Sequence, residues 1–133
     1  MALPHTRIAL AQVNPTVGDF AGNGARIRQA TERARAAGAN LVVFPELCLS
    51  GYPPRDFLDL PEFVDRSRTL LAELAAPAEW SKGMALALGF PEAAEGAPPP
   101  GLYNAVALIS AGRVRAVGRK SLLPTYDVFD ETR

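Results

Sequence analysis

The sequence predicts an α/β domain with a mixed sheet. Apolar segments typical of buried strands alternate with amphipathic segments in the first part of the chain, which favours helices packed on parallel strands. Two further strand-like segments then follow one another across a short turn that contains glycine, as in a hairpin. The length of 133 residues, with 48% apolar and 21% charged residues, fits one folded domain or a piece of a larger one.

The first half of the chain supplies two strands and a helix. Residues 6–13 are apolar with β-branched positions and predict a strand. Asp19 ends the following turn and is suited to cap a helix over 21–37, for which Gly38 is the expected stop. Residues 40–44 are short and almost wholly apolar, which is typical of a strand covered on both faces.

The second half supplies a helix and three strands. Pro61 suits the first turn of a helix, and the apolar pattern that follows it fades by Pro77. The remaining segments are expected to be a loop over 45–59, a strand over 84–90, an exposed loop over 92–101, a hairpin of strands over 102–109 and 114–119, and a loop over 121–133. With both helices on one face of the sheet, the other face needs cover.

Composition excludes several classes of function. The charges balance, with 14 Lys and Arg against 14 Asp and Glu, which removes the usual electrostatic argument for nucleic acid or an anionic membrane as partner. No apolar run reaches the roughly 18 residues that span a bilayer, and the N-terminus lacks the pattern of a signal peptide. A single cysteine and a single histidine leave no disulfide framework and no Cys- or His-based metal site. A cytoplasmic protein is therefore expected.

Glu46 is the first candidate for chemistry. It directly follows the carboxyl end of a predicted buried strand, and ligands of open α/β sheets gather beyond such ends. Its apolar neighbours Phe44, Leu47 and Leu49 would raise the proton affinity of the carboxylate, as suits a general base. A solvated loop carboxylate or a helix cap would explain the residue equally simply.

Lys120 is the second candidate, at the end of the last predicted strand. Lys82 and Lys120 are the only lysines beside twelve arginines, and lysine alone of the two can readily lose its proton. If its strand belongs to the same sheet, Lys120 could reach Glu46 and stabilise an oxyanion or hold a nucleophile near its base. An ordinary surface lysine is the alternative.

Three further segments are weighed against plainer explanations. Cys48 lies among apolar neighbours that make a thiol inert, so a buried structural thiol is expected. Residues 18–27 approach a dinucleotide-binding fingerprint, but Ile27 replaces its last glycine, and helix capping by Asp19 is the simpler explanation. The acidic and aromatic residues of 126–131 could line a pocket or form a solvated turn.

Taken together, three stretches resemble the nitrilase, or carbon-nitrogen hydrolase, superfamily, and most closely the N-terminal glutaminase domains of glutamine-dependent NAD synthetases. The stretches are 8–19 (IALAQVNPTVGD), 44–56 (FPELCLSGYPPRD) and 119–131 (RKSLLPTYDVFDE). Their order matches the family, and the Gly-Tyr-Pro-Pro-x-Asp and Tyr-x-Val-Phe-Asp-Glu segments distinguish this branch from ordinary nitrilases and amidases.

The resemblance implies an α-β-β-α sandwich and a Glu-Lys-Cys catalytic set. Glu46 matches the general base and Lys120 the catalytic lysine. The positions that match the surroundings of the glutamine site are Tyr52, Tyr126, Phe129 and Glu131. The implied reaction is hydrolysis of the side-chain amide of L-glutamine through a thioester. The ammonia would pass to a separate synthetase domain that uses ATP and Mg to convert nicotinic acid adenine dinucleotide to NAD, in a protein expected to be a homo-oligomer.

The chain departs from the family pattern in its last segment and in its extent. Thr125 and Asp127 stand where the family more usually has Asn and Gly, which affects the expected loop geometry. The nucleophilic cysteine of the family lies beyond position 133, and Cys48 matches a variable position. Residues 1–133 are thus expected to be the N-terminal portion of the glutaminase domain, inactive alone and without a cofactor. The alternatives are a stand-alone carbon-nitrogen hydrolase acting on another small amide, and a non-catalytic nucleotide-binding module that uses a turn at 22–24.

Overall fold

A computed structural model describes residues 5–77, 83–94 and 101–121. Its centre is a sheet with the strand order β1-β2-β3-β4-β5. The strands are β1 (Ile8–Leu10), β2 (Leu41–Val43), β3 (Ala85–Ala93), β4 (Leu102–Ser110) and β5 (Arg113–Arg119). The first three are parallel, and β4 and β5 continue the sheet as antiparallel neighbours. The predicted α/β class and mixed sheet are confirmed.

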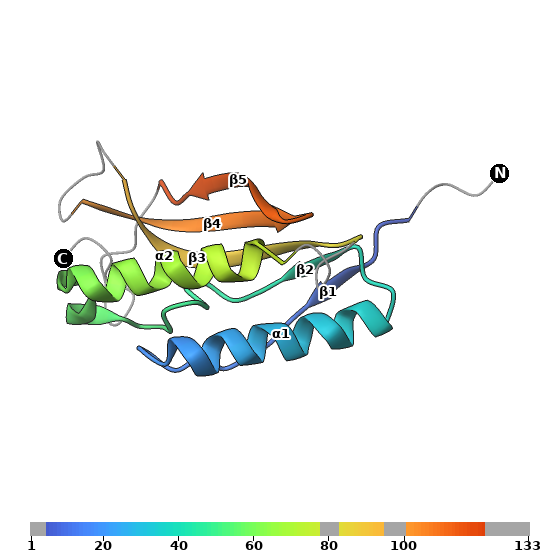
Figure 1. Ribbon diagram of the computed structural model, residues 1–133, viewed down its shortest axis with the longest axis horizontal. Coiled ribbons are helices and arrows are strands. Elements are labelled where there is room, and N and C mark those ends of the chain that lie inside the picture. Colours follow the sequence, from blue (N-terminus) through green and yellow to red (C-terminus); the bar gives the residue numbers. More distant parts are fainter. Residues whose placement is uncertain (1–4, 78–82, 95–100, 122–133) are drawn as a thin grey trace.

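Two helices cover one face of this sheet, α1 (Phe20–Ala36) and α2 (Pro61–Ala75) (Figure 1). Asp19 caps α1 as predicted, because its carboxylate accepts a hydrogen bond from the Gly22 amide at 2.9 Å. Pro61 occupies the first turn of α2, where its missing N–H costs nothing. The Phe20 and Phe63 rings meet edge to face, with centroids 5.3 Å apart, and join the N-terminal ends of the two helices.

The core lies between the helices and the sheet. Alternate strand residues point toward the helices, as the period of two requires. The largest fully buried side chains of this core are Ile27, Val42, Leu49, Leu74, Leu86, Leu88 and Ile109. Burial of a side chain of this size stabilises the fold by about 1.5–3 kcal/mol.

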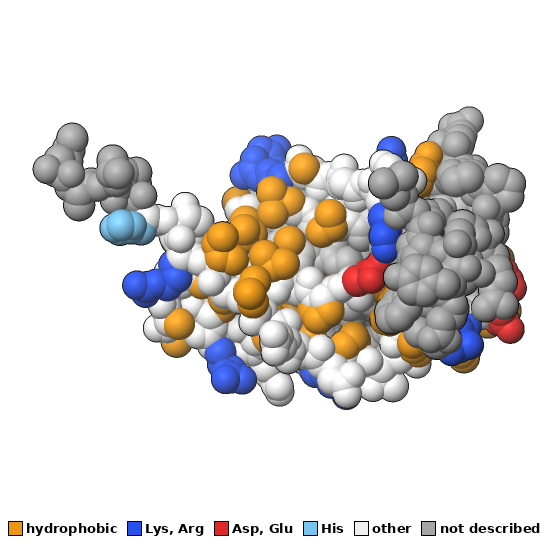
Figure 2. Space-filling model, turned by 180° about the vertical axis from the view of Figure 1, so that it is seen from behind, with side chains coloured by type: hydrophobic (Ala, Val, Ile, Leu, Met, Phe, Trp, Pro, Cys, Tyr) orange, Lys and Arg blue, Asp and Glu red, His pale blue; other side chains and the backbone are white. Residues whose placement is uncertain are grey.

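The opposite face of the sheet carries apolar side chains that remain exposed. Ile8 and Leu10 of β1 are 54% and 72% exposed, and Val106 and Leu108 of β4 are 45% and 36% exposed. Figure 2 shows apolar side chains gathered on the side of the molecule that faces away from the viewer of Figure 1. Over the described residues, the expectation that one face of the sheet lacks cover is confirmed.

Several boundaries differ from the sequence prediction. The strands predicted over 6–13 and 40–44 shorten to Ile8–Leu10 and Leu41–Val43. β3 instead runs past its predicted end to Ala93, taking part of the predicted loop 92–101. Pro91 is tolerated there because β2 has already ended, so that side of β3 needs no amide donor.

The loop predicted over 45–59 contains a short 3-10 helix, η1 (Arg55–Asp59). Almost all of the last predicted loop, residues 122–133, lies outside the described residues. Within the part of the chain that the structure describes, neither helix is long and apolar enough to cross a membrane.

Candidate active site

The sheet topology brings the ends of several strands together on one side of the sheet. Because β1, β2 and β3 are parallel, their carboxyl ends share that edge. β4 runs the opposite way and begins there, where Leu102 pairs with Ala93, and β5 ends there, where Arg119 pairs with Ala105. Residues just after β2, at the start of β4 and just after β5 are therefore neighbours.

Glu46 and Lys120 meet at this edge. Lys120 Nζ donates to Glu46 Oε1 at 3.0 Å, although the two residues are 74 positions apart in the chain. The Glu46 side chain is 42% exposed and the Lys120 side chain 36% exposed, so the ion pair is in contact with water. The predicted proximity of these two groups is thus observed.

The apolar surroundings expected for Glu46 are found only in part, since Phe44 lines the same cavity as Glu46 whereas Leu47 and Leu49 do not. Leu47 and Leu49 are buried, with exposures of 5% and 0%, and belong to the core side of the loop. Glu46 itself is on the exposed side. Neighbours in sequence point to different sides of the tight Pro45–Leu47 segment, so Leu47 and Leu49 pack into the core rather than against the Glu46 carboxylate.

Asn104 is a third member of the site that the sequence analysis missed. Its side-chain amide nitrogen donates to Glu46 Oε1 at 2.5 Å. Its backbone oxygen accepts the Lys120 N–H at 2.9 Å, one step beyond the β4–β5 ladder. A polar side chain at the start of the otherwise apolar strand 102–109 was the available signal.

Gly89 allows Glu46 to reach β4 and β5. The segment after β2 crosses over β3 at Gly89, where a Cβ would lie only 2.4 Å from the Leu47 nitrogen and 3.0 Å from the Pro45 oxygen. The Gly89 carbonyl also accepts the Leu49 amide at 3.2 Å. Close backbone approach of this kind excludes any side chain at that position.

A cavity of about 380 Å³ opens beside the three polar groups. Its floor includes a row across three strands, in which Val106 pairs with Gly89 on one side and with Gly118 on the other. At Gly118 the missing side chain leaves space for the cavity, whereas the backbone of Pro45 and Leu47 occupies the place where a Gly89 side chain would stand. The described lining residues are Phe44, Pro45, Glu46, Gly89, Asn104, Ala105, Val106, Gly118, Arg119 and Lys120.

Arg119 fixes the end of β5 on the neighbouring strands. Its Nε donates to Glu92 Oε1 at 2.5 Å, and its guanidinium lies over the Tyr103 ring, 4.7 Å from the centroid. The hydrogen bond to Glu92 raises the pKa of Arg119 above its ordinary value. Arg119 therefore keeps its charge. Because Arg119 holds the end of β5 in place, it also fixes the backbone position of Lys120, the next residue.

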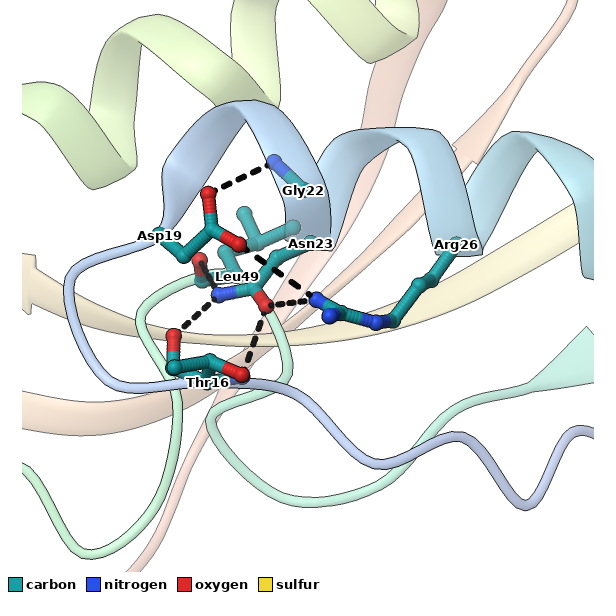
Figure 3. Close-up of polar contacts among 6 residues, drawn as sticks. All are labelled: Thr16, Asp19, Gly22, Asn23, Arg26 and Leu49. Atoms are coloured by element: carbon teal, nitrogen blue, oxygen red, sulfur yellow. Dashed lines mark hydrogen bonds and ion pairs between the residues drawn. The ribbon is translucent and has the colours of Figure 1, made fainter.

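A buried polar cluster anchors the loop that follows Glu46 (Figure 3). Asn23, 1% exposed, donates to the oxygens of Thr16 and Leu49 at 2.9 and 3.1 Å, and its Oδ1 accepts the Thr16 amide at 2.8 Å. Arg26 donates to the same Oδ1 at 3.1 Å and lies 3.8 Å from Asp19. One amide thus ties the loop after β1 to the loop after β2.

The segment 22–24 is not a turn, contrary to the expectation behind the nucleotide-binding alternative. It lies in the first turns of α1. Gly24 packs so closely that a Cβ would come within 3.0 Å of Leu70 Cδ1. The Asn23 amide is directed into the protein.

Cys48 is buried, as predicted. It is fully enclosed, and desolvation raises the pKa of its thiol to about 12. Its Sγ lies 3.7 Å from the Gly89 oxygen, under the loop that carries Glu46. Such a thiol supports packing, and little thiolate forms near neutral pH.

Of the other predicted site residues, the described structure includes only Tyr52. Tyr52 is half-buried beside a cis peptide bond to Pro53 and does not line the cavity. Tyr126, Phe129 and Glu131 lie outside the described residues. Within the described ranges, no three His, Cys, Asp or Glu side chains gather closely enough to hold a metal ion.

The arrangement can move a proton and neutralise a developing negative charge. A carboxylate that contacts an amine and an amide donor, beside an open cavity at the carboxyl end of a strand, meets the geometric requirements of a general base near a cation.

The chain is similar to known proteins over nearly its whole length. The family model of carbon-nitrogen hydrolases matches residues 7–132. A glutamine-dependent NAD(+) synthetase of Thermotoga maritima is 41% identical over 127 residues, and one of Synechocystis sp. is 43% identical over 127 residues. These matches cover 96% and 95% of this chain but 21% and 23% of the relatives, so the chain spans about a fifth of their length.

Solved structures show the same fold. The glutamine-dependent NAD+ synthetase of Acinetobacter baumannii superposes with a TM-score of 0.81 at 33% identity, over 93% of this chain and 22% of that one. An amidase from Nesterenkonia sp. superposes with a TM-score of 0.75 at 29% identity, over 94% of this chain and 46% of that one. With its α/β fold and a family match over nearly its whole length, the chain belongs to the carbon-nitrogen hydrolase family.

Proposed function

We propose that this chain supplies the general base and the cationic group of a glutaminase that releases ammonia for NAD synthesis. The observation that carries the proposal is the 3.0 Å contact between Lys120 Nζ and Glu46 Oε1 at the mouth of the cavity. Support for glutamine as substrate comes from the relatives, which are named glutamine-dependent NAD(+) synthetases.

In the proposed reaction, Glu46 transfers one proton in each of two stages, first from the thiol and then from water. Its carboxylate first accepts the proton of a cysteine thiol, and the thiolate sulfur attacks the amide carbon of glutamine. Lys120 stabilises the negative charge that forms on the amide oxygen. Glu46 then returns the proton to the leaving nitrogen, so that ammonia departs and a thioester remains. Glu46 then deprotonates a water molecule, which attacks the thioester carbon. Glu46 returns that proton to the departing thiolate, so that glutamate forms and the thiol is regenerated.

The thiol of this scheme is not Cys48. Burial and a raised thiol pKa make Cys48 a poor nucleophile, and its side chain lies under the loop rather than in the cavity. We therefore place the nucleophile in polypeptide outside residues 1–133. The substrate contacts assigned to Tyr52, Tyr126, Phe129 and Glu131 belong to the same proposal.

We further propose that residues 1–133 form the N-terminal portion of the glutaminase domain. The exposed apolar face around Ile8, Leu10, Val106 and Leu108 would pack on a second sheet from the rest of that domain. The match to the amidase supports this proposal, because it covers 94% of this chain but only 46% of the amidase chain. Packing there would also remove water from the Glu46–Lys120 pair and strengthen its electrostatics. The 133-residue chain alone should then release no ammonia from glutamine.

The ammonia would be used by a synthetase portion, also outside this chain, that consumes ATP with Mg and converts nicotinic acid adenine dinucleotide to NAD. We expect this protein to be cytoplasmic and homo-oligomeric, which cell fractionation and light scattering would test. NAD formation with glutamine as the nitrogen source, but not with glutamine omitted, would support the coupling.

The decisive test uses the longest natural polypeptide that contains this sequence. Glu46→Gln and Lys120→Met should each lower glutamate release from glutamine by about 100- to 10,000-fold, the usual contribution of acid-base and charge stabilisation. Glu62→Gln, on the exposed first turn of α2, is the matched control and should leave the rate unchanged. Normal turnover after either site substitution would overturn the proposal.

A stand-alone amidase is the second candidate, favoured by the likeness to the Nesterenkonia amidase. It predicts faster hydrolysis of short aliphatic amides than of glutamine, and no NAD formation by the same polypeptide. Glutamate and ammonia release, compared across glutamine, acetamide and propionamide, separates the two candidates.

A further inference from the structure

Asn104 contacts both members of the proposed catalytic pair. Its side-chain amide donates to Glu46 Oε1 at 2.5 Å, and its main-chain oxygen accepts the Lys120 N–H at 2.9 Å. Lys120 Nζ donates to that same Oε1 at 3.0 Å. Asn104 therefore holds the Glu46 carboxylate through its side chain. Through its backbone it holds the end of the strand that precedes Lys120.

The strand around Asn104 makes it a rigid support. It lies in β4, the fourth strand of the sheet, with β3 on one side and β5 on the other, and it pairs with Pro91 of β3. Glu46, in contrast, lies in a loop and its side chain is 42% exposed. A flexible, exposed carboxylate loses much rotamer freedom when it is held in one orientation, and a strand-mounted donor reduces that cost during the reaction.

The chemistry of an amide suits this role. An asparagine nitrogen donates to a carboxylate and carries no charge that changes with pH, so it orients the base without competing for its proton. A donor to the ionised carboxylate also favours the charged, proton-accepting form. A leucine of similar volume would lose the donor, and an aspartate of the same shape would add a like charge.

We propose that Asn104 is a positioning residue that orients the Glu46 carboxylate and keeps it in its proton-accepting form. This inference rests on the proposed glutaminase function. It assigns Asn104 no contact with substrate. Its effect is exerted through Glu46, so it should change the pH dependence of catalysis more than the affinity for glutamine.

The test uses the longest natural polypeptide that contains this chain, assayed for glutamate release across pH. N104L should lower kcat by roughly 10- to 100-fold, the range for a misplaced catalytic group, with a small change in KM. Losing the donor raises the proton affinity of Glu46, so the acid limb of the profile should move to higher pH. N104D should move that limb further in the same direction because it adds a like charge.

N40L is the matched control. Asn40 is an exposed asparagine at the opposite end of the sheet, where its Oδ1 accepts the Arg7 amide at 2.8 Å. N40L should change Tm about as much as N104L and should leave the pH profile in place. An acid limb that neither N104L nor N104D moves, with activity falling only as Tm falls, would assign Asn104 a purely structural role and overturn the proposal.

A second measurement separates failure of this inference from failure of the proposed function. If the unsubstituted polypeptide does not hydrolyse glutamine, the proposed function fails. The carbon-13 titration of the Glu46 carboxyl, in the same polypeptide with and without N104L, then tests the contact itself. A higher midpoint in N104L supports the influence of Asn104 on Glu46, and an unchanged midpoint overturns it.

Discussion

Gly89 lies directly under Leu47, so close that a Cβ on Gly89 would be 2.4 Å from the Leu47 nitrogen. This contact exists because Glu46 follows β2, whereas Asn104 lies in β4 and Lys120 follows β5, both on the far side of β3. The chain must cross β3 to bring the carboxylate to its partners. The absence of a side chain at the crossing point is what allows Glu46 to reach Asn104 and Lys120.

Gly89→Ala should therefore destabilise the fold and displace Glu46 together. The added methyl group meets backbone atoms of Pro45, Glu46 and Leu47, which cannot rotate away as a flexible side chain would. Overpacking of this kind costs about 1–3 kcal/mol in the free energy of unfolding. Urea unfolding of the 133-residue chain measures the loss. An unchanged unfolding midpoint would show that the loop can shift without cost and that Gly89 is not required.

Gly118→Ala is the control for Gly89→Ala. Gly118 lies in β5, where an added methyl group would contact a side chain and no backbone atom of the described residues. Among the described residues, its Cβ would approach only Val106 Cγ1, at 3.4 Å. Since glycine within a strand costs about 0.5–1 kcal/mol relative to alanine, Gly118→Ala should leave the free energy of unfolding unchanged or slightly raised. The sign of the effect thus reverses between two glycines that flank the same residue, Val106.

Gly118→Leu should fill the cavity without disturbing the loop that carries Glu46. Gly118 lines the cavity, and a leucine side chain there would occupy part of its 380 Å³. In the longest natural polypeptide that contains this chain, we expect KM for glutamine to rise while Tm changes little. Unaltered KM and kcat would mean that glutamine does not enter this cavity.

The sequence predicts which strand ends form this site better than it predicts the exposure and contacts of the individual side chains. Alternating strand and helix segments followed by a hairpin were sufficient to place Glu46 and Lys120 at one edge, because parallel strands share their carboxyl ends. The exposure of Glu46 could not be predicted, since it depends on which side of a tight loop each residue takes. Asn104 and Gly89 acquire their roles only through cross-strand register, which no local pattern specifies.

Cys48 should make stability fall at alkaline pH. Desolvation raises its thiol pKa from 9.0 to about 12, so above pH 9 the unfolded chain loses a proton that the folded chain keeps. The stabilisation is present in full below the unfolded value and is lost as the pH rises through the interval between the two. Urea unfolding of wild type and Cys48→Ala from about pH 7, below that interval, to about pH 11, within it, isolates the effect.

The difference in unfolding free energy between the two proteins carries the information, because other groups that titrate at high pH contribute to both. Cys48→Ala should cost about 1 kcal/mol near neutral pH through lost packing, and this deficit should shrink as the pH rises. Iodoacetamide should label Cys48 only after unfolding. A deficit that stays constant with pH, or rapid labelling of the native chain, would contradict the burial that separates Cys48 from the proposed chemistry.

Asn23→Ala tests whether the loops around the site are held by the cluster in Figure 3. The substitution removes both the donor to Thr16 and Leu49 oxygens and the acceptor of the Thr16 amide, leaving buried backbone groups without their partner. Each of these three groups costs about 1–3 kcal/mol, so a loss of about 3 kcal/mol or more in the free energy of unfolding is expected.

Asp19→Ala is the reference variant with which the loss of unfolding free energy in Asn23→Ala is compared. It removes one exposed capping bond to the Gly22 amide at the start of the same helix, which is worth about 1 kcal/mol. If Asn23 only caps α1, the two variants should unfold at similar urea concentrations. If it ties the loop after β1 to the loop after β2, Asn23→Ala should be the more destabilised, and amide exchange at Gly18, which donates to Ser50 between the same two loops, should accelerate in Asn23→Ala alone.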